Sequence, residues 1–195
     1  MSRTAHRYEP GVWHHITVTT ATRRPLFTDA ARARILQERL NAARRRFALL
    51  CIGYVIMPDH FHWVIYPTEP GFEDFAAEQI QKGGRYADDP AAYYLPRIVE
   101  EVKRGTTQAI RRLARSLPQQ IWQPGFWDRP VQDMRRLPDI LRYIHMNPVR
   151  AGLCSRPTDY PYSSHNAMVY DHPHAVVLDR MIWEQLGIPS VNRRV

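Results

Sequence analysis

Two histidines, His60 and His62, lie two residues apart in a run of apolar and aromatic residues. The run His60–Tyr66 has the composition of a β-strand, in which alternate side chains share one face. The two imidazoles therefore lie side by side, while Phe61 and Trp63 point to the opposite face, toward a core. Two neighbouring imidazoles are suited to chelating one divalent metal ion. Two polar residues on an exposed strand face are the competing interpretation, and the histidines alone do not decide between them.

A tyrosine and an asparagine, Tyr143 and Asn147, lie one helical turn apart in a segment with helical periodicity. We expect the helix to span Leu137–Met146 and to end before Pro148. Tyr143 lies beside the apolar stripe of this helix, not at its centre. A phenol so placed can attack phosphorus as a nucleophile if a nearby cation stabilises the charge, and Asn147 can offer an amide oxygen to the same metal ion. The apolar stripe consists of Leu137, Ile140, Leu141 and Ile144, and the neighbouring face carries Arg136, Asp139, Tyr143 and Asn147.

The charge balance indicates a polyanionic partner. The chain has 27 basic and 19 acidic residues, a net charge of +8, and 25 of the basic residues are arginines. Codon usage in a GC-rich genome can explain arginine in place of lysine, but not the positive sign. Residues 23–46 and 98–156 each carry a net charge of +6, whereas residues 67–97 carry −3. Two basic regions therefore flank an acidic insert.

The basic regions contain the residues predicted to contact DNA phosphates. A basic helix face is often simply solvated, but here few acidic residues balance it, which favours phosphate contact. His14 and His15, on the first predicted strand, are weaker candidates for DNA contact, because strand histidines are usually just solvated. The predicted DNA-binding residues are Arg23, Arg24, Lys103, Arg104, Arg111, Arg112, Arg115 and Arg129.

Several protein classes are disfavoured by the sequence. The longest apolar stretch, Cys51–Met57, is far shorter than the roughly 20 residues of a membrane-spanning helix. The N-terminus shows no apolar segment of the secretory type, so we expect a cytoplasmic, nucleoid-associated protein. The two cysteines, Cys51 and Cys154, have no metal-type spacing and are expected to be reduced thiols. A chain of 195 residues with 44% hydrophobic residues is long enough for one well-packed domain.

The expected elements follow the order β-α-β-β-α-β, with a further helix that carries Tyr143. This order is typical of an α+β fold with a ferredoxin-like or RRM-like antiparallel sheet, two helices on one face and the other face free for a site. Pro58 and Asp59 form the turn between the middle strands. We expect strands over residues 12–20, 48–57, 60–66 and 122–131, and helices over 29–47, 98–116 and 137–146.

Two segments fall outside this pattern. The acidic insert, about residues 67–97, is rich in proline and glycine, so we expect a loop with a short helix over 72–81. The tail, residues 166–195, has one candidate helix over 177–186. The main domain is therefore expected to span residues 1–165.

Four motifs together resemble one known family. They are MPDHFHWVIYP (57–67), IWQPGFWDRPV (121–131), YIHMNPVRAGL (143–153) and DYPYSSH (159–165). In this order they are similar to the REP-associated tyrosine transposases, a branch of the HUH single-strand DNA transposases. The resemblance covers roughly residues 10–165. The acidic insert takes the place of a short loop in the family, and the tail matches nothing in it.

The resemblance implies a role for each of four residues. His60 and His62 would hold Mg²⁺ or Mn²⁺, Tyr143 would be the nucleophile, and Asn147 would complete the metal site. The implied substrate is a single-stranded or hairpin DNA of the repetitive extragenic palindrome type, cut through a 5′-phosphotyrosine intermediate. The chain would act as a monomer or a homodimer, which the sequence leaves undecided.

Two other functions remain open from the sequence. A non-catalytic single-strand nucleic-acid-binding module of RRM-like topology would use the same fold without chemistry. A metallonuclease that activates water would need the histidines but not Tyr143.

Overall fold

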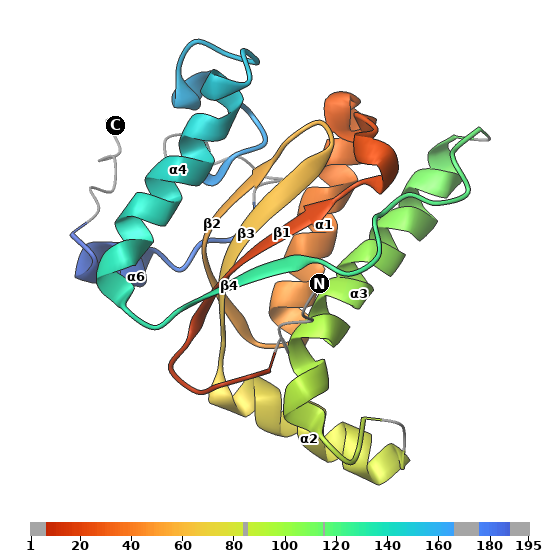
Figure 1. The fold of residues 1–195 in the computed structure, drawn as a ribbon, viewed down its shortest axis with the longest axis vertical. Coiled ribbons are helices and arrows are strands. Elements are labelled where there is room, and N and C mark those ends of the chain that lie inside the picture. The colour runs from red at the N-terminus through yellow and green to blue at the C-terminus, as the bar shows by residue number, and fades with distance from the viewer. Residues whose placement is uncertain (1–6, 84–85, 115, 166–175, 188–195) are drawn as a thin grey trace.

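Four antiparallel strands form the central sheet of the computed structural model, which describes residues 7–83, 86–114, 116–165 and 176–187 (Figure 1). Their order is β2-β3-β1-β4. The hairpin β2–β3 turns at Pro58-Asp59, and β1 lies between β3 and β4. The predicted α+β class and antiparallel sheet are confirmed. The strands are β1 (Trp13–Thr19), β2 (Leu49–Ile56), β3 (His60–Pro67) and β4 (Trp127–Val131).

Helices α1 (Ala30–Arg46) and α3 (Pro90–Leu113) cover one face of the sheet. Asp29 caps α1 by accepting a hydrogen bond from the backbone N–H of Arg32, which satisfies one free donor of the first turn. Phe61, Trp63 and Ile65 of β3 point into this core, as their alternation with the histidines predicted. The helices contribute Leu36 and Leu40 of α1 and Ile98, Val102 and Ile110 of α3 to the same core.

Helix α4 (Leu137–Arg150) packs against part of the opposite face. Its apolar stripe meets Trp13, Val55, Val64 and Val131, which alternate with the residues of the first core along their strands. The sheet is therefore covered by α1 and α3 on one side and partly by α4 on the other (Figure 1). The space beside α4 on that second face is where the histidines lie.

The predicted end of the tyrosine helix at Pro148 is wrong, since α4 continues to Arg150. A proline within a helix removes one hydrogen bond, but the turn that follows supplies others. The N–H of Leu153 reaches the carbonyl of Pro148, and the N–H of Gly152 reaches that of Val149. Gly152 has a φ of +68°, so this is a Schellman end, and glycine permits it.

The acidic insert is helical, not a loop. Helix α2 (Glu69–Lys82) is longer than the short helix expected, and α3 begins at Pro90, well before residue 98. Both helices have a proline in the first turn, where its missing N–H has no helical partner to lose. The side chains of Thr68 and Asp89 cap the two helices. The prolines that suggested a loop therefore mark helix starts.

The last part of the chain covers the open edge of β2. The N–H of Ile56 reaches the carbonyl of Tyr162, and Ser164 bonds the backbone of Tyr54. The N–H and carboxylate of Asp179 bond the carbonyl and N–H of Cys51. Helix α6 (Arg180–Gln185) and β4 are both shorter than predicted. Short 3-10 helices span Ala21–Arg23, Leu26–Thr28, Met134–Arg136 and Pro157–Asp159.

No helix within the described residues combines the length and the apolar character needed to cross a membrane.

Candidate functional site

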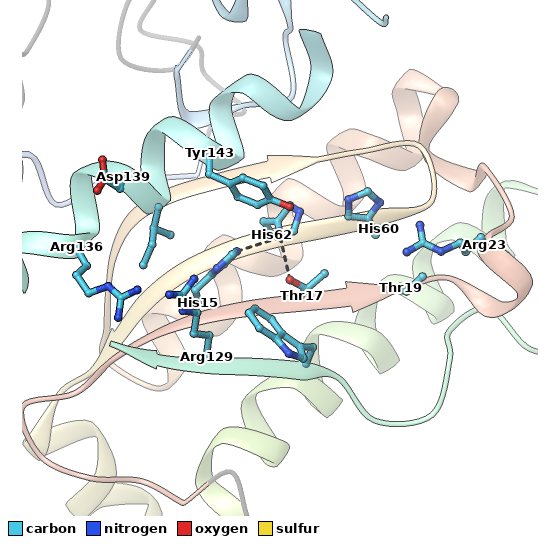
Figure 2. Close-up of a pocket in the computed structure, with 12 residues that line it drawn as sticks. His15, Thr17, Thr19, Arg23, His60, His62, Arg129, Arg136, Asp139 and Tyr143 are labelled. Atoms are coloured by element: carbon cyan, nitrogen blue, oxygen red, sulfur yellow. Dashed lines mark hydrogen bonds between the residues drawn. The ribbon is translucent and has the colours of Figure 1, made fainter. Parts of the chain in front are cut away.

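A cavity of about 640 Å³ lies between the sheet and α4 (Figure 2). It brings together five residues singled out from the sequence, which lie far apart along the chain: Arg23, His60, His62, Arg129 and Tyr143. Figure 2 shows Tyr143 extending from α4 over the sheet toward His62, with Arg23 at one end of the pocket and Arg129 and Arg136 at the other. The complete lining is His15, Thr17, Thr19, Arg23, His60, His62, Trp127, Arg129, Arg136, Asp139, Ile140 and Tyr143.

His62 is buried at the floor of the pocket, and two residues of β1 hold its ring. Its Nδ1 lies 2.9 Å from the hydroxyl oxygen of Thr17 and 3.1 Å from Nε2 of His15. Burial, together with neighbouring His15 and His60, lowers the pKa of His62 to about 3. The ring is therefore neutral at physiological pH. If Nδ1–H donates to Thr17, the lone pair of Nε2 is available as a metal ligand.

The carboxylate of Asp59 holds the ring of His60. Nδ1 of His60 lies 2.6 Å from Oδ1 of Asp59, and Oδ2 of Asp59 accepts a hydrogen bond of 2.9 Å from Arg23. Burial alone would raise the pKa of Asp59, but the hydrogen bonds and charges of His60 and Arg23 lower it. Asp59 is thus a carboxylate that fixes the ring of His60 and leaves its Nε2 available.

Tyr143 is half exposed, with 46% of its surface accessible. Its ring centroid lies 5.9 Å from that of His62 and 6.3 Å from that of His15. The guanidinium of Arg150, two turns further along α4, lies 5.5 Å from the Tyr143 ring centroid. A phenol that is accessible, close to two imidazoles and flanked by a cation can meet a phosphate bound in the pocket.

The position of α4 depends on contacts on its other side. Nε2 of His145 lies 2.6 Å from the hydroxyl oxygen of Ser164, which accepts a hydrogen bond from the N–H of Tyr54 and donates one to its carbonyl. Burial and the neighbouring His165 lower the pKa of His145 to about 3. Ser164 therefore links the helix of Tyr143 directly to β2.

Gly53 lets α4 approach the sheet closely. An ideal Cβ at this position would lie well under 3 Å from Cδ2 of Leu141 and 3.2 Å from Cδ1 of Ile144. Leu141 and Ile144 are buried and lie on either side of Tyr143 in the sequence. The absence of a side chain at Gly53 thus sets how far above the sheet Tyr143 lies.

A divalent metal ion is implied by the family resemblance, and the histidines fit one. The ring centroids of His60 and His62 are 5.0 Å apart, and both Nδ1 atoms are engaged by an oxygen. Among the described residues, no group of three or more His, Cys, Asp or Glu side chains is placed to hold one ion. The remaining ligands would be an amide such as that of Asn147, water or DNA oxygens.

Comparison with known proteins finds relatives of the chain, although no protein-family model matches it. A Haemophilus influenzae protein assigned as a REP-associated tyrosine transposase is 26% identical over 66% of this chain and 70% of its own length. The REP-associated tyrosine transposase of Escherichia coli is 24% identical over 57% of this chain, and the match spans about half, 52%, of that protein. The chain is thus similar in sequence to two proteins named as REP-associated tyrosine transposases.

A solved structure shares the fold of this chain. This structure of a REP-associated tyrosine transposase bound to a REP hairpin superimposes with a TM-score of 0.63. It is 21% identical and covers 100% of this chain and 99% of its own. The shared fold is the α+β arrangement with its four-stranded antiparallel sheet.

The predicted DNA-binding residues that the structure describes are divided between two faces of the sheet. Arg23 and Arg129 line the pocket, and exposed Arg24 is next to Arg23 in the chain. Lys103, Arg104, Arg111 and Arg112 lie on α3, which covers the opposite face of the sheet. Arg115 lies outside the described residues.

Three of these four α3 residues have partners within the protein. The ammonium of Lys103 donates to the carbonyls of Gln123 and Gly125, and burial lowers its pKa to about 8. Arg104 bonds the carboxylate of Glu101, and Arg111 donates to a backbone carbonyl. Arg112 is exposed. Asn147 is half buried and is not among the residues that line the pocket.

Sequence reasoning left several pocket residues out of the predicted site. The alternation that pairs His60 with His62 also places His15, Thr17 and Thr19 on one face of β1, and the register sets Thr17 opposite His62. The alternation along β1 could have been read from the sequence. His14, considered together with His15, instead points to the helix side of the sheet, where it pairs with Asp128 at 3.1 Å and is buried. The remaining residues left out are Trp127, Arg136, Asp139 and Ile140.

Proposed function

We propose that the chain is a tyrosine transposase that cuts and rejoins single-stranded DNA at hairpins of the REP type. The observation that carries the proposal is the accessible phenol of Tyr143 in one pocket with the anchored imidazoles of His60 and His62, with arginines at both ends. The named relatives support the substrate class.

The reaction needs few groups. The scissile phosphate binds between the arginine-lined ends of the pocket, and the Tyr143 oxygen attacks phosphorus. The new O–P bond forms as the bond to the 3′-oxygen breaks, and the phenolic proton is transferred through water to that oxygen. The products are a 5′-phosphotyrosine and a free 3′-hydroxyl, and attack by a 3′-hydroxyl reverses the step. The phosphotyrosine conserves the bond energy, so rejoining needs no nucleotide cofactor.

His60, His62 and Asn147 are the proposed ligands of a Mg²⁺ or Mn²⁺ ion. When bound, this ion supplies a Lewis acid that polarises the phosphate. Thr17 and Asp59 hold the two imidazoles in the orientation that this role requires. Arg23 and Arg129 neutralise phosphate charge, and the salt bridge to Asp59 orients Arg23.

The strand order β2-β3-β1-β4, with α1 and α3 on one face, supports a ferredoxin-like assignment of the fold. We assign residues 1–165 to the transposase domain. Its contact with the tail at Asp179 and Cys51 stabilises the edge of β2.

Incubation with a DNA hairpin carrying single-stranded flanks and Mn²⁺ tests the function. We expect cleavage and a covalent protein–DNA adduct on a denaturing gel, both lost on chelation of the metal. Binding without cleavage would instead indicate a non-catalytic single-strand-binding module. Cleavage without any adduct would indicate a nuclease that uses water.

His60→Ala and His62→Ala test the metal ligands. Each should abolish cleavage while the far-ultraviolet circular dichroism spectrum stays unchanged. Arg34→Ala, on α1 at the opposite face of the sheet, is a control that should retain cleavage.

A further inference from the structure

Trp127 is an exposed indole at the edge of the pocket. It is 52% exposed, whereas the other four tryptophans of the chain are between 0% and 7% exposed. An exposed indole that lines a polar cavity has a large flat surface with no partner on one side. Its position, at the start of β4, makes it accessible to a ligand that enters the pocket.

The sheet register aims this indole into the pocket. Trp127 lies opposite Thr17, and Arg129 lies opposite His15, so both side chains share the face that carries the histidines. The indole meets the His15 ring nearly at a right angle, with centroids 5.5 Å apart. This contact orients the ring and leaves much of the indole accessible.

Two arginines lie beside the indole. Arg129 is the next residue of β4 on the same face, and Arg136 comes from the turn that leads into α4. Within the described part of the chain, neither guanidinium has an ion pair with an acidic side chain. Both arginines also line a second cavity of about 210 Å³ that shares Arg129, Arg136 and Ile140 with the first. Asp133 also lines the second cavity, where its carboxylate binds Arg135. The arginine side chains therefore continue from the pocket along the edge of β4.

An aromatic face next to two guanidinium groups fits an unpaired nucleotide. Every base has a flat π-face that can stack on an indole, and arginine binds phosphate oxygens in bidentate fashion. A base within a duplex is already stacked on both sides, so it cannot use such a surface. The ligand chemistry that this arrangement fits is single-stranded nucleic acid.

We propose that Trp127, Arg129 and Arg136 form a subsite for one unpaired nucleotide adjoining the scissile phosphate. Its base stacks on Trp127, and the arginines bind the phosphates on either side of it. The subsite is tolerant of base identity, because stacking does not require a specific hydrogen-bond pattern. The proposal rests on the proposed function in taking the pocket to be where DNA strands are cut.

The stacking contact is tested by binding in the Tyr143→Phe background, where no chemistry occurs. The probe is a DNA hairpin with a four-nucleotide unpaired flank on each side. Trp127→Ala should weaken its binding by about 5- to 150-fold, the range typical for loss of one base–aromatic stack. Trp127→Phe should keep most of the affinity, because it keeps a ring. Arg34→Ala, an exposed arginine of α1 on the opposite face of the sheet, should bind like the parent.

Abasic substitution locates the nucleotide. Each flank position is replaced in turn by an abasic site, and binding is measured with Trp127 present and with Trp127→Ala. At one position, the abasic site should weaken binding to the parent but have no further effect on Trp127→Ala. If the two effects multiply at every position, no base stacks on Trp127 and the proposal is wrong.

Fluorescence and salt dependence give independent readouts. Since Trp127 is the exposed tryptophan, iodide should quench it in the free protein, and the hairpin probe should protect it. Arg129→Gln should make the salt dependence less steep, by a slope of about 0.7. Unchanged iodide quenching on saturation with DNA would overturn the subsite. The covalent adduct of the Tyr143-containing protein is measured separately, so failure of the subsite is distinguishable from failure of the proposed function.

Discussion

Replacing Gly53 by alanine should move the helix that carries Tyr143. The added methyl would lie well under 3 Å from Cδ2 of Leu141 and 3.2 Å from Cδ1 of Ile144, whereas carbon atoms pack at about 3.5–4.0 Å. Both neighbours are buried, with at most 2% of their surface exposed, so neither can rotate into solvent. The clash must therefore be relieved by a displacement of α4 on the order of 1 Å.

This displacement should lower both the stability of the protein and the rate of adduct formation. Overpacking of a core costs about 1–3 kcal/mol, which in a protein of this size corresponds to a Tm lower by roughly 2–12 °C. A displacement of about 1 Å at the nucleophile can slow a reaction by about 100-fold. The rate of adduct formation should therefore fall by more than the loss of folded protein explains.

Thermal unfolding and single-turnover adduct formation measure the two effects. Gly105→Ala is a matched control, because its Cβ would meet only the flexible side chain of Arg39. It should leave the adduct rate unchanged. Leu141→Ala removes the atom that clashes, so Gly53→Ala combined with it should be less destabilised than the sum of the two single variants. A Gly53→Ala protein with the parent's Tm and adduct rate would refute this account of how α4 is positioned.

Two further predictions follow from the hydrogen bonds and pKa values of the histidines. Thr17→Val removes the hydroxyl beside Nδ1 of His62 at nearly constant shape, so Mn²⁺ affinity measured by calorimetry should fall by about 10- to 100-fold. Thr19→Val, also in the pocket, should not change it, and equal affinities in all three proteins would contradict the role given to Thr17. Because His145 has a pKa of about 3 when folded and 6.5 when unfolded, the unfolded chain binds the proton first. The free energy of unfolding should therefore be constant above pH 6.5 and fall below it, by up to about 1.4 kcal/mol per pH unit for this residue. Urea unfolding between pH 7.5 and 4.5 measures the slope, which His145→Gln should reduce; identical slopes in both proteins would show that His145 is not the group responsible.

The predictable part of the site is the part set by local periodicity. Alternation along one strand was enough to place Phe61 and Trp63 in a core and the two histidines on the other face. Helical spacing was enough to place Tyr143 beside an apolar stripe, not within it. Both conclusions depend on residues a few positions apart, whose relative directions are fixed by backbone geometry.

The part that could not be predicted depends on partners far away in the sequence. The arginines of α3 had the right charge to bind phosphate, but Glu101 interacts with Arg46, Arg97 and Arg104 at once, and Lys103 turns toward backbone carbonyls. Net charge over a segment does not reveal such pairing. Proline was ambiguous for a related reason, because it ends a helix in some contexts and begins one in others.

The identity of the nucleophile is the central claim, and mass spectrometry tests it most directly. The protein is incubated with the hairpin probe and Mn²⁺, the DNA is trimmed with nuclease, and the tryptic peptides are sequenced. We predict a nucleotide attached to the phenol of Tyr143, and neither cleavage nor adduct in Tyr143→Phe, which keeps the ring and the fold. A nucleotide on another tyrosine, such as Tyr66 or Tyr162, or cleavage that persists in Tyr143→Phe, would contradict the account.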